Sequence, residues 1–125
     1  MKHKNVIKSK SFFFAIQIWH LYHYLVNERK EFILSKQILR SGTAVGAIIR
    51  EAEHAESKLD FKHKMSIAQK EINETIYWLE LLNEIDYLEE VRYVKLMSES
   101  NEILRIITKI ILTVKHNLTI CQCLK

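Results

Sequence analysis

Between residues 58 and 85, apolar side chains recur at alternating spacings of four and three. This spacing places them on one face of an α-helix, as in helices that pack together in bundles. The chain also has no proline and only two glycines in 125 residues, a composition that favours long, uninterrupted helices. The sequence therefore predicts an all-α fold. The repeating residues are Phe61, Met65, Ala68, Ile72, Thr75, Leu79 and Leu82.

Four helical segments are predicted along the chain, joined by short connections. A chain of 125 residues is expected to form a single domain. Short connections make consecutive helices antiparallel neighbours, so we expect an up-down-up-down four-helix bundle. The expected helices cover about residues 9–28, 31–56, 58–85 and 89–117, and residues 118–125 are expected to form a C-terminal tail.

The predicted second helix has small residues on its buried face. A glycine inside a helix costs about 1 kcal/mol relative to alanine, so Gly42 and Gly46 indicate close packing or a local bend. Helix caps are also expected: Ser57 or Asp60 for the third helix and Asp86 for the fourth. The expected buried face comprises Leu34, Ile38, Ser41, Val45, Ile48, Ala52 and Ala55.

The first and fourth helices carry more apolar surface than one bundle buries. A helix that is apolar on two sides is covered on two sides, and the natural cover is a second copy of the chain. We therefore expect a homo-oligomer. In the first helix, Phe14, Ile18, Leu21 and Leu25 form the buried row, and Phe12, Ile16, Trp19 and Val26 lie nearly opposite. In the fourth, the row of Met97, Leu104, Ile111 and Leu118 is widened by Leu96, Ile103 and Ile110.

The charge of the chain permits an anionic partner. The net charge is +4, and its positive excess lies towards the two ends of the chain. Lysine and arginine on one helix face pair with phosphates, and a nearby aromatic ring stacks on an unpaired base. The sequence thus predicts an RNA- or DNA-binding surface. Its candidate residues are Arg40, Arg50, Lys62, Lys64 and Lys70.

A second interpretation of the same helices stays open. Lys62, His63 and Lys70 form an outward basic stripe on the predicted third helix, but Glu71 and Glu74 interrupt it. Mixed Lys and Glu residues are typical of ordinary solvent-exposed helices. In that case the protein is an interaction scaffold without nucleic-acid binding. Tyr77, Trp78 and Leu81 would then dock a helix of a partner protein.

No catalytic, metal or cofactor site is expected. A di-metal bundle needs Glu and His pairs that point into the core, but Glu51 and His54 face outward at 3.6 residues per turn, as does His63. Two histidines at 20 and 23 lack further ligands nearby in the sequence. There is also no nucleophile on a glycine-rich turn and no phosphate-binding loop. The sequence predicts a protein that is not an enzyme.

The cysteines and the N-terminal segment favour the cytoplasm. Cys121 and Cys123 are too few and too close in sequence to frame a disulfide-rich fold, and with His116 they make only a weak metal motif. The apolar run Phe12–Trp19 follows four lysines, as in a signal peptide. His20 and His23 break that run, and no small-residue cleavage site follows. No stretch reaches the roughly 20 apolar residues that span a membrane.

The predicted second and third helices carry a distinctive set of short motifs. The second contains a Gln-x-x-Arg-Ser-Gly-Thr pattern, with Gln37, Arg40, Ser41, Gly42, Thr43, Gly46, Ala47, Glu51 and Ala52. The third contains Ser57, Lys58, Asp60, Phe61, His63, Lys64, Lys70, Glu71, Asn73, Glu74, Thr75 and the run Tyr77–Leu82. With these motifs, residues 9–116 resemble a bacterial family of four-helix-bundle proteins, the 23S ribosomal RNA intervening-sequence proteins.

This resemblance implies a homopentameric ring and a non-catalytic accessory role with nucleic acid. A related accessory protein of diversity-generating retroelements shares the pentameric bundle and associates with a reverse transcriptase. Two positions depart from the family pattern: Ile48 replaces an asparagine, and Asp86 replaces a glycine. Ile48 suggests that a polar contact has become apolar packing. Asp86 suggests a capped turn in place of a left-handed helix end.

Overall fold

The computed structural model describes the backbone of residues 2–123 and the side chains of residues 6–119. It is all-α, with four helices and no strand in the part of the chain that it describes. No helix in that part is long and apolar enough to cross a membrane. The helices are α1 (Lys2–Asn27), α2 (Leu34–Ala52), α3 (Lys58–Glu84) and α4 (Glu90–Cys123).

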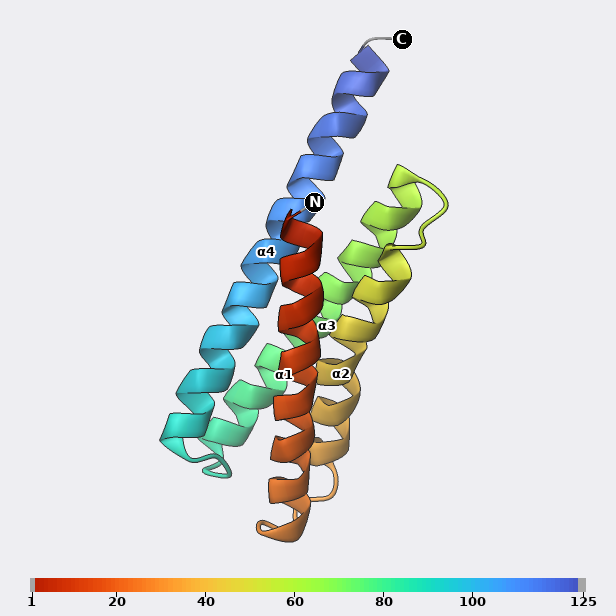
Figure 1. Ribbon diagram of the computed structural model, residues 1–125. Coiled ribbons are helices and arrows are strands. Elements are labelled where there is room, and N and C mark those ends of the chain that lie inside the picture. Colours follow the sequence, from red (N-terminus) through yellow and green to blue (C-terminus); the bar gives the residue numbers. More distant parts are fainter. Residues whose placement is uncertain (1, 124–125) are drawn as a thin grey trace.

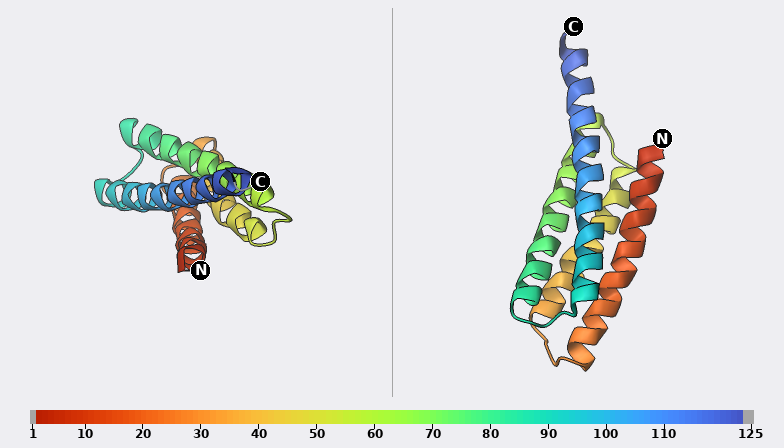
Figure 2. Two further views of the ribbon diagram at one scale, coloured as in Figure 1. Left: turned by 90° about the horizontal axis from the view of Figure 1, so that it is seen from above. Right: turned by 90° about the vertical axis from the view of Figure 1, so that its left-hand side faces the viewer.

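The four helices pack side by side around one core. Helix α1 packs against α2 and α4, and α3 packs against the same two helices, so α1 and α3 lie diagonally opposite (Figure 1). The α1–α2 and α3–α4 loops lie at one end of the molecule and the α2–α3 loop at the other. Figure 2 shows that the C-terminal part of α4 extends beyond the other three helices.

The rows predicted for the first and third helices form the core. Phe14, Ile18, Leu21 and Leu25 of α1 are at most 1% exposed. The α3 row is also buried from Met65 to Leu82, and Phe61 packs against it at the edge. These predictions are confirmed, because the alternation of four and three residues follows the face of a helix that its neighbours cover.

The buried face of α2 differs from the prediction at its end and in its middle. The helix ends at Ala52, so Ala55, which was expected on this face, lies beyond it and is half-buried. Ile49 is 3% exposed and lies in the core, whereas Ile48 is half-buried at its edge. The displacement arises because α1 approaches α2 along Gly42 and Gly46, which turns the buried arc of α2 towards that side. A Cβ atom built on Gly42 would lie 2.8 Å from Cγ2 of Ile18. Close packing, one of the two alternatives for the glycines, is thus confirmed at Gly42.

Helix α4 buries most of its wide apolar arc within its own bundle. Leu96, Ile103 and Ile111 are buried, and so is Ile107, which the predicted rows do not contain. Of the side chains expected to widen the arc, Leu96 and Ile103 are thus in the core and Ile110 packs partly against it, so they do not form a second exposed row. Met97 and Leu104 of the predicted row are also only partly buried. Exposed apolar side chains lie on α1, where Phe12 and Trp19 are each 50% exposed, and also on α4, where Val94 and Leu112 are 57% and 59% exposed.

Two helices are longer than predicted. Helix α1 begins at Lys2, and α4 continues to Cys123 through most of the segment expected to be a tail. The helical spacing of apolar residues continues through Val114 and Leu118, and neither proline nor glycine interrupts it. Sequence alone therefore underestimates the length of α4.

The start of α3 follows the predicted capping. The hydroxyl of Ser57 accepts a hydrogen bond from the Asp60 amide at 3.0 Å. The Asp60 carboxylate in turn accepts one from the Glu56 amide at 3.1 Å. This reciprocal arrangement satisfies amides that have no partner within the helix.

The prediction for Asp86 is wrong. Asp86 does not cap α4; it adopts a left-handed conformation with φ of 65° at the end of α3. The Tyr87 amide donates to the Leu82 carbonyl at 2.8 Å, and the Asp86 amide donates to the Asn83 carbonyl at 3.1 Å. This pair of bonds is the Schellman arrangement that usually carries glycine. Backbone hydrogen bonding at the helix end has outweighed the side chain's preference for a cap.

Candidate nucleic-acid interface

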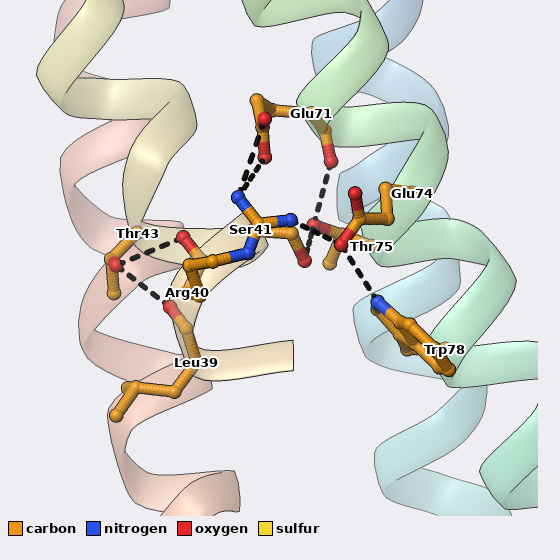
Figure 3. A network of polar contacts seen from close by, with 8 residues as sticks. All are labelled: Leu39, Arg40, Ser41, Thr43, Glu71, Glu74, Thr75 and Trp78. Atoms are coloured by element: carbon orange, nitrogen blue, oxygen red, sulfur yellow. Dashed lines mark hydrogen bonds and ion pairs between the residues drawn. The ribbon is translucent and has the colours of Figure 1, made fainter. Parts of the chain in front are cut away.

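Arg40 is an ion-paired residue of the α2–α3 interface. Its Nη1 lies 3.1 Å from Oε2 of Glu71, and its Nη2 pairs with Oε2 of Glu74 (Figure 3). The indole Nε1 of Trp78 donates to the same Glu74 oxygen at 3.0 Å. Arg40 thus binds two carboxylates of the neighbouring helix, which leaves it poorly placed to contact phosphate.

Titration of these groups reflects the same contacts. The hydrogen bond from Trp78, followed by that from Arg40, holds the pKa of Glu74 below its ordinary value. The hydrogen bond to Glu74 raises the pKa of Arg40, and the charge of Glu71 adds to that effect. Both shifts favour the charged pair.

A buried polar contact lies next to this network. The hydroxyls of Ser41 and Thr75 are 2.8 Å apart, and both side chains are fully buried. Thr75 is also 2.9 Å from the Glu71 carbonyl. The polar members of the α2 and α3 rows therefore satisfy each other inside the core.

Two further candidate residues also have partners. The guanidinium of Arg50 lies 5.1 Å from the centre of the Phe12 ring, which places it over α1. Nζ of Lys64 lies 3.6 Å from a carboxylate oxygen of Glu51. Both contacts are at the surface, where ion pairs and cation–π contacts contribute little to stability.

Lys62 and Lys70 form no ion pair with any residue whose side chain is described. Both are on α3, and exposed His63 and Tyr77 lie on the same helix. The five predicted residues thus do not gather at one point: Arg40 and Arg50 are on α2, and the three lysines are on α3. Of the five, Lys62 and Lys70 are the best placed to bind an anion.

The groove between α1 and α4 is a feature that sequence reasoning missed. Arg92 stacks over the Tyr24 ring at 4.6 Å, and Gln17 donates to Glu99 at 3.2 Å. Nη1 of Arg92 and Oε2 of Glu99 are buried without a hydrogen-bond partner among the described atoms. The spacing could have indicated this groove, because Arg92 and Glu99 lie seven residues apart on the same side of α4 as core residue Leu96.

The side chains considered as metal ligands lie at the surface. Glu51, His54 and His63 are exposed, in agreement with the outward orientation expected from helix geometry. Among the described side chains, no three His, Cys, Asp or Glu residues gather as a metal site. The side chains of Cys121 and Cys123 lie outside the described residues.

The sequence model of the 23S rRNA-intervening sequence protein family matches residues 3–109. The chain belongs to this family. The crystal structure of a protein of unknown function from the S23 ribosomal protein family, from Bacteroides thetaiotaomicron VPI-5482, superposes with a TM-score of 0.86 at 53% sequence identity. The match covers 87% of this chain and 97% of that one. No curated protein matches the chain. The resemblance seen in the sequence is therefore confirmed, and with it membership of a family of helical proteins.

Proposed function

We propose that this member of the 23S rRNA-intervening sequence protein family is a non-catalytic, cytoplasmic accessory protein that binds RNA or DNA. In the proposal, up-down-up-down bundles assemble into a homopentameric ring, and the outward face of α3 contacts phosphates. Repetition of one basic face around a ring adds weak contacts through multivalency.

One observation carries the proposal. The two carboxylates that interrupt the basic stripe of α3, Glu71 and Glu74, are both bound by Arg40 of α2. The single positive charge of Arg40 therefore offsets about half of their combined negative charge within the protein. Lys62 and Lys70 have no such partner among the described side chains, and Tyr77 is 57% exposed on the same helix. Cations beside an exposed aromatic ring suit a nucleic-acid strand.

The family and the apolar surface of α1 support the other parts of the proposal. The family is named for intervening sequences of 23S rRNA, which makes structured RNA the first ligand to test. Phe12, Ile16 and Trp19 are between 40% and 50% exposed on one side of α1, as expected for a face that a second copy covers.

The alternative function is a protein-interaction scaffold, and the structure exposes less of its expected docking surface (Tyr77, Trp78 and Leu81) than the sequence suggested. Trp78 is half-buried and donates to Glu74, and Leu81 is also half-buried. Tyr77 is the one member of the proposed docking trio that is mostly exposed. Binding of a partner helix to this face would therefore depend chiefly on contacts with Tyr77.

The test is fluorescence anisotropy of labelled structured RNA, single-stranded DNA and duplex DNA over a salt series. We expect binding that weakens steeply with log salt, because each neutralised phosphate releases counterions. Reversing Lys62, Lys64 and Lys70 to glutamate should abolish it. The control reverses Lys36, Lys109 and Lys115, three exposed lysines elsewhere, with the same change in net charge.

Two results would count against the proposal. Absence of binding to all three probes at low salt would contradict nucleic-acid binding and favour the scaffold. Equal loss of affinity in the α3 variant and the control would show that overall charge, and not the α3 face, drives binding.

A further inference from the structure

The outward side of α1 is an apolar stripe with basic neighbours. Phe12, Ile16 and Trp19 follow one another at four and three residues and are 50%, 40% and 50% exposed. The Arg50 guanidinium lies over Phe12, and the His23 ring lies 4.0 Å from the Trp19 ring. Residues 1–27 contain four lysines and neither aspartate nor glutamate. Of these lysines, Lys8 and Lys10 pair with Glu53 and Glu102, whereas Arg50 beside the stripe forms no ion pair with a described side chain.

The opposite charge pattern lies at the end of α3 and the start of α4. Residues 71–91 contain seven carboxylates and neither lysine nor arginine. Beyond the two bound by Arg40, the remaining carboxylates are exposed, and none forms an ion pair with a described side chain. Ile85 and Val94 nearby are 45% and 57% exposed. We define the acidic corner as Glu80, Glu84, Ile85, Glu90 and Val94.

We propose that the outward side of α1 in one copy packs against the acidic corner of a second copy. This inference rests on the homo-oligomer of the proposed function and names the two surfaces that meet in it. Both surfaces expose apolar side chains, and their charges are complementary, which fixes the choice of partner and the register. Glu80 and Glu84 are on α3, which lies diagonally across the bundle from α1, so this part of the acidic corner and the stripe are on different sides of one copy.

This position of the surfaces determines the kind of assembly. A contact between two different surfaces is heterologous, so each copy can bind one neighbour on each side and the chain of copies can close into a ring. A contact between two α1 stripes would instead bring together two surfaces that each carry the Arg50 cation and no described carboxylate of α1. Like charges facing each other in an interface oppose association.

The test uses two variants, each of which damages one surface. The stripe variant carries Phe12→Asp and Trp19→Asp, and the corner variant carries Glu80→Lys and Glu84→Lys. Light scattering at micromolar concentration should give the mass of an oligomer for the parent. Each variant alone should give a smaller mass, down to that of a single chain. An equimolar mixture should contain two-chain complexes, because the intact corner of the first variant can bind the intact stripe of the second.

Control variants distinguish the proposed interface from the proposed oligomeric state. Glu51→Lys with Glu56→Lys makes the same charge change at exposed positions far from the acidic corner and should keep the parental mass. Circular dichroism checks folding, and the single variants Ile16→Glu and Glu84→Lys replace any double variant that unfolds. A parental mass for the corner variant would overturn the inference and leave the oligomer standing. A single-chain mass for the parent would overturn both.

Discussion

Gly42 of α2 lies directly against Ile18 of α1, with room for a hydrogen atom but not for a methyl group. A Cβ atom at this position would lie 2.8 Å from Cγ2 and 2.9 Å from Cγ1 of Ile18. Ile18 is fully buried and branches close to its backbone, so it has little freedom to move away. At Gly46, by contrast, the nearest atom to a Cβ would be the Ser11 carbonyl oxygen at 3.4 Å, an ordinary contact.

Alanine substitutions at the two glycines should therefore have opposite effects. Gly42→Ala should destabilise the protein by about 1–2 kcal/mol, because overpacking costs more than the gain in helix propensity. Gly46→Ala should stabilise it by up to about 1 kcal/mol through propensity alone. Urea unfolding of both variants beside the parent measures the difference. Equal changes in stability would contradict the close contact at Gly42.

The network around Glu74 should make stability depend on pH. The folded-state pKa of Glu74 is below its ordinary value of 4.5, so the unfolded chain binds this proton more readily. The contribution of Glu74 is therefore present above about pH 4.5 and is lost as the pH falls through the folded-state pKa. Glu74→Gln should lower the urea midpoint at pH 7 and have a smaller effect at pH 3.

Glu56→Gln is the matched control for this pH experiment. Glu56 is exposed just before α3, and its carboxylate forms no ion pair with a described side chain. The urea midpoint of this variant should equal that of the parent at both pH values. A Glu74 effect that is equally large at both pH values would mean that charge at Glu74 does not stabilise the fold.

Asp86 should be replaceable by glycine with a gain in stability. An L-residue in the left-handed region costs roughly 1–2 kcal/mol, less for aspartate than for alanine, while glycine has no such cost. The carboxylate of Asp86 makes no helix-capping bond that would be lost. Thermal melts should therefore rank Asp86→Gly above the parent and the parent above Asp86→Ala, with steps of about 1 kcal/mol or less. An alanine variant as stable as the glycine variant would contradict the left-handed geometry.

Where sequence predicted the fold correctly, the information was local or periodic. The α3 row from Met65 to Leu82 follows from spacing alone, and the Ser57 cap follows from its position before a helical pattern. The exchange of Ile48 for Ile49 could not be predicted in this way. Both positions fit a helical stripe, and the choice depends on how closely α1 approaches Gly42 and Gly46.

In the candidate site too, the features within one helix were predictable from sequence, whereas the contacts between helices were not. Sequence identified Lys62, Lys70 and Arg40 as cations on helix surfaces, but it could not show that Arg40 is paired with Glu71 and Glu74. That pairing depends on the register between α2 and α3, which spacing within one helix does not reveal. For the same reason, sequence treated the two glutamates as interruptions of a basic stripe, although they bind Arg40.

The start of α2 provides a last prediction, because a glutamate outside the helix caps it. The Glu31 carboxylate accepts hydrogen bonds from the amides of Leu34 at 3.1 Å and Ser35 at 2.8 Å. It also accepts one from the Ile33 amide at 3.1 Å. Ile33 itself supplies no side-chain cap. The carboxylate thus satisfies backbone groups that have no partner within the helix, at its positive end.

Glu31→Ala should therefore destabilise the protein by about 1–2 kcal/mol, the usual cost of losing a helix cap. Glu28→Ala is the control, since Glu28 is exposed three residues earlier and its carboxylate makes no hydrogen bond with a described residue. Glu31→Gln should fall between the two, because the amide oxygen still accepts but lacks the charge that favours a helix N-terminus. Urea midpoints of the three variants give this order directly. If Glu31→Ala and Glu28→Ala were equally stable, the cap would contribute nothing, and α2 would be held in place by its packing against α1 and α3 alone.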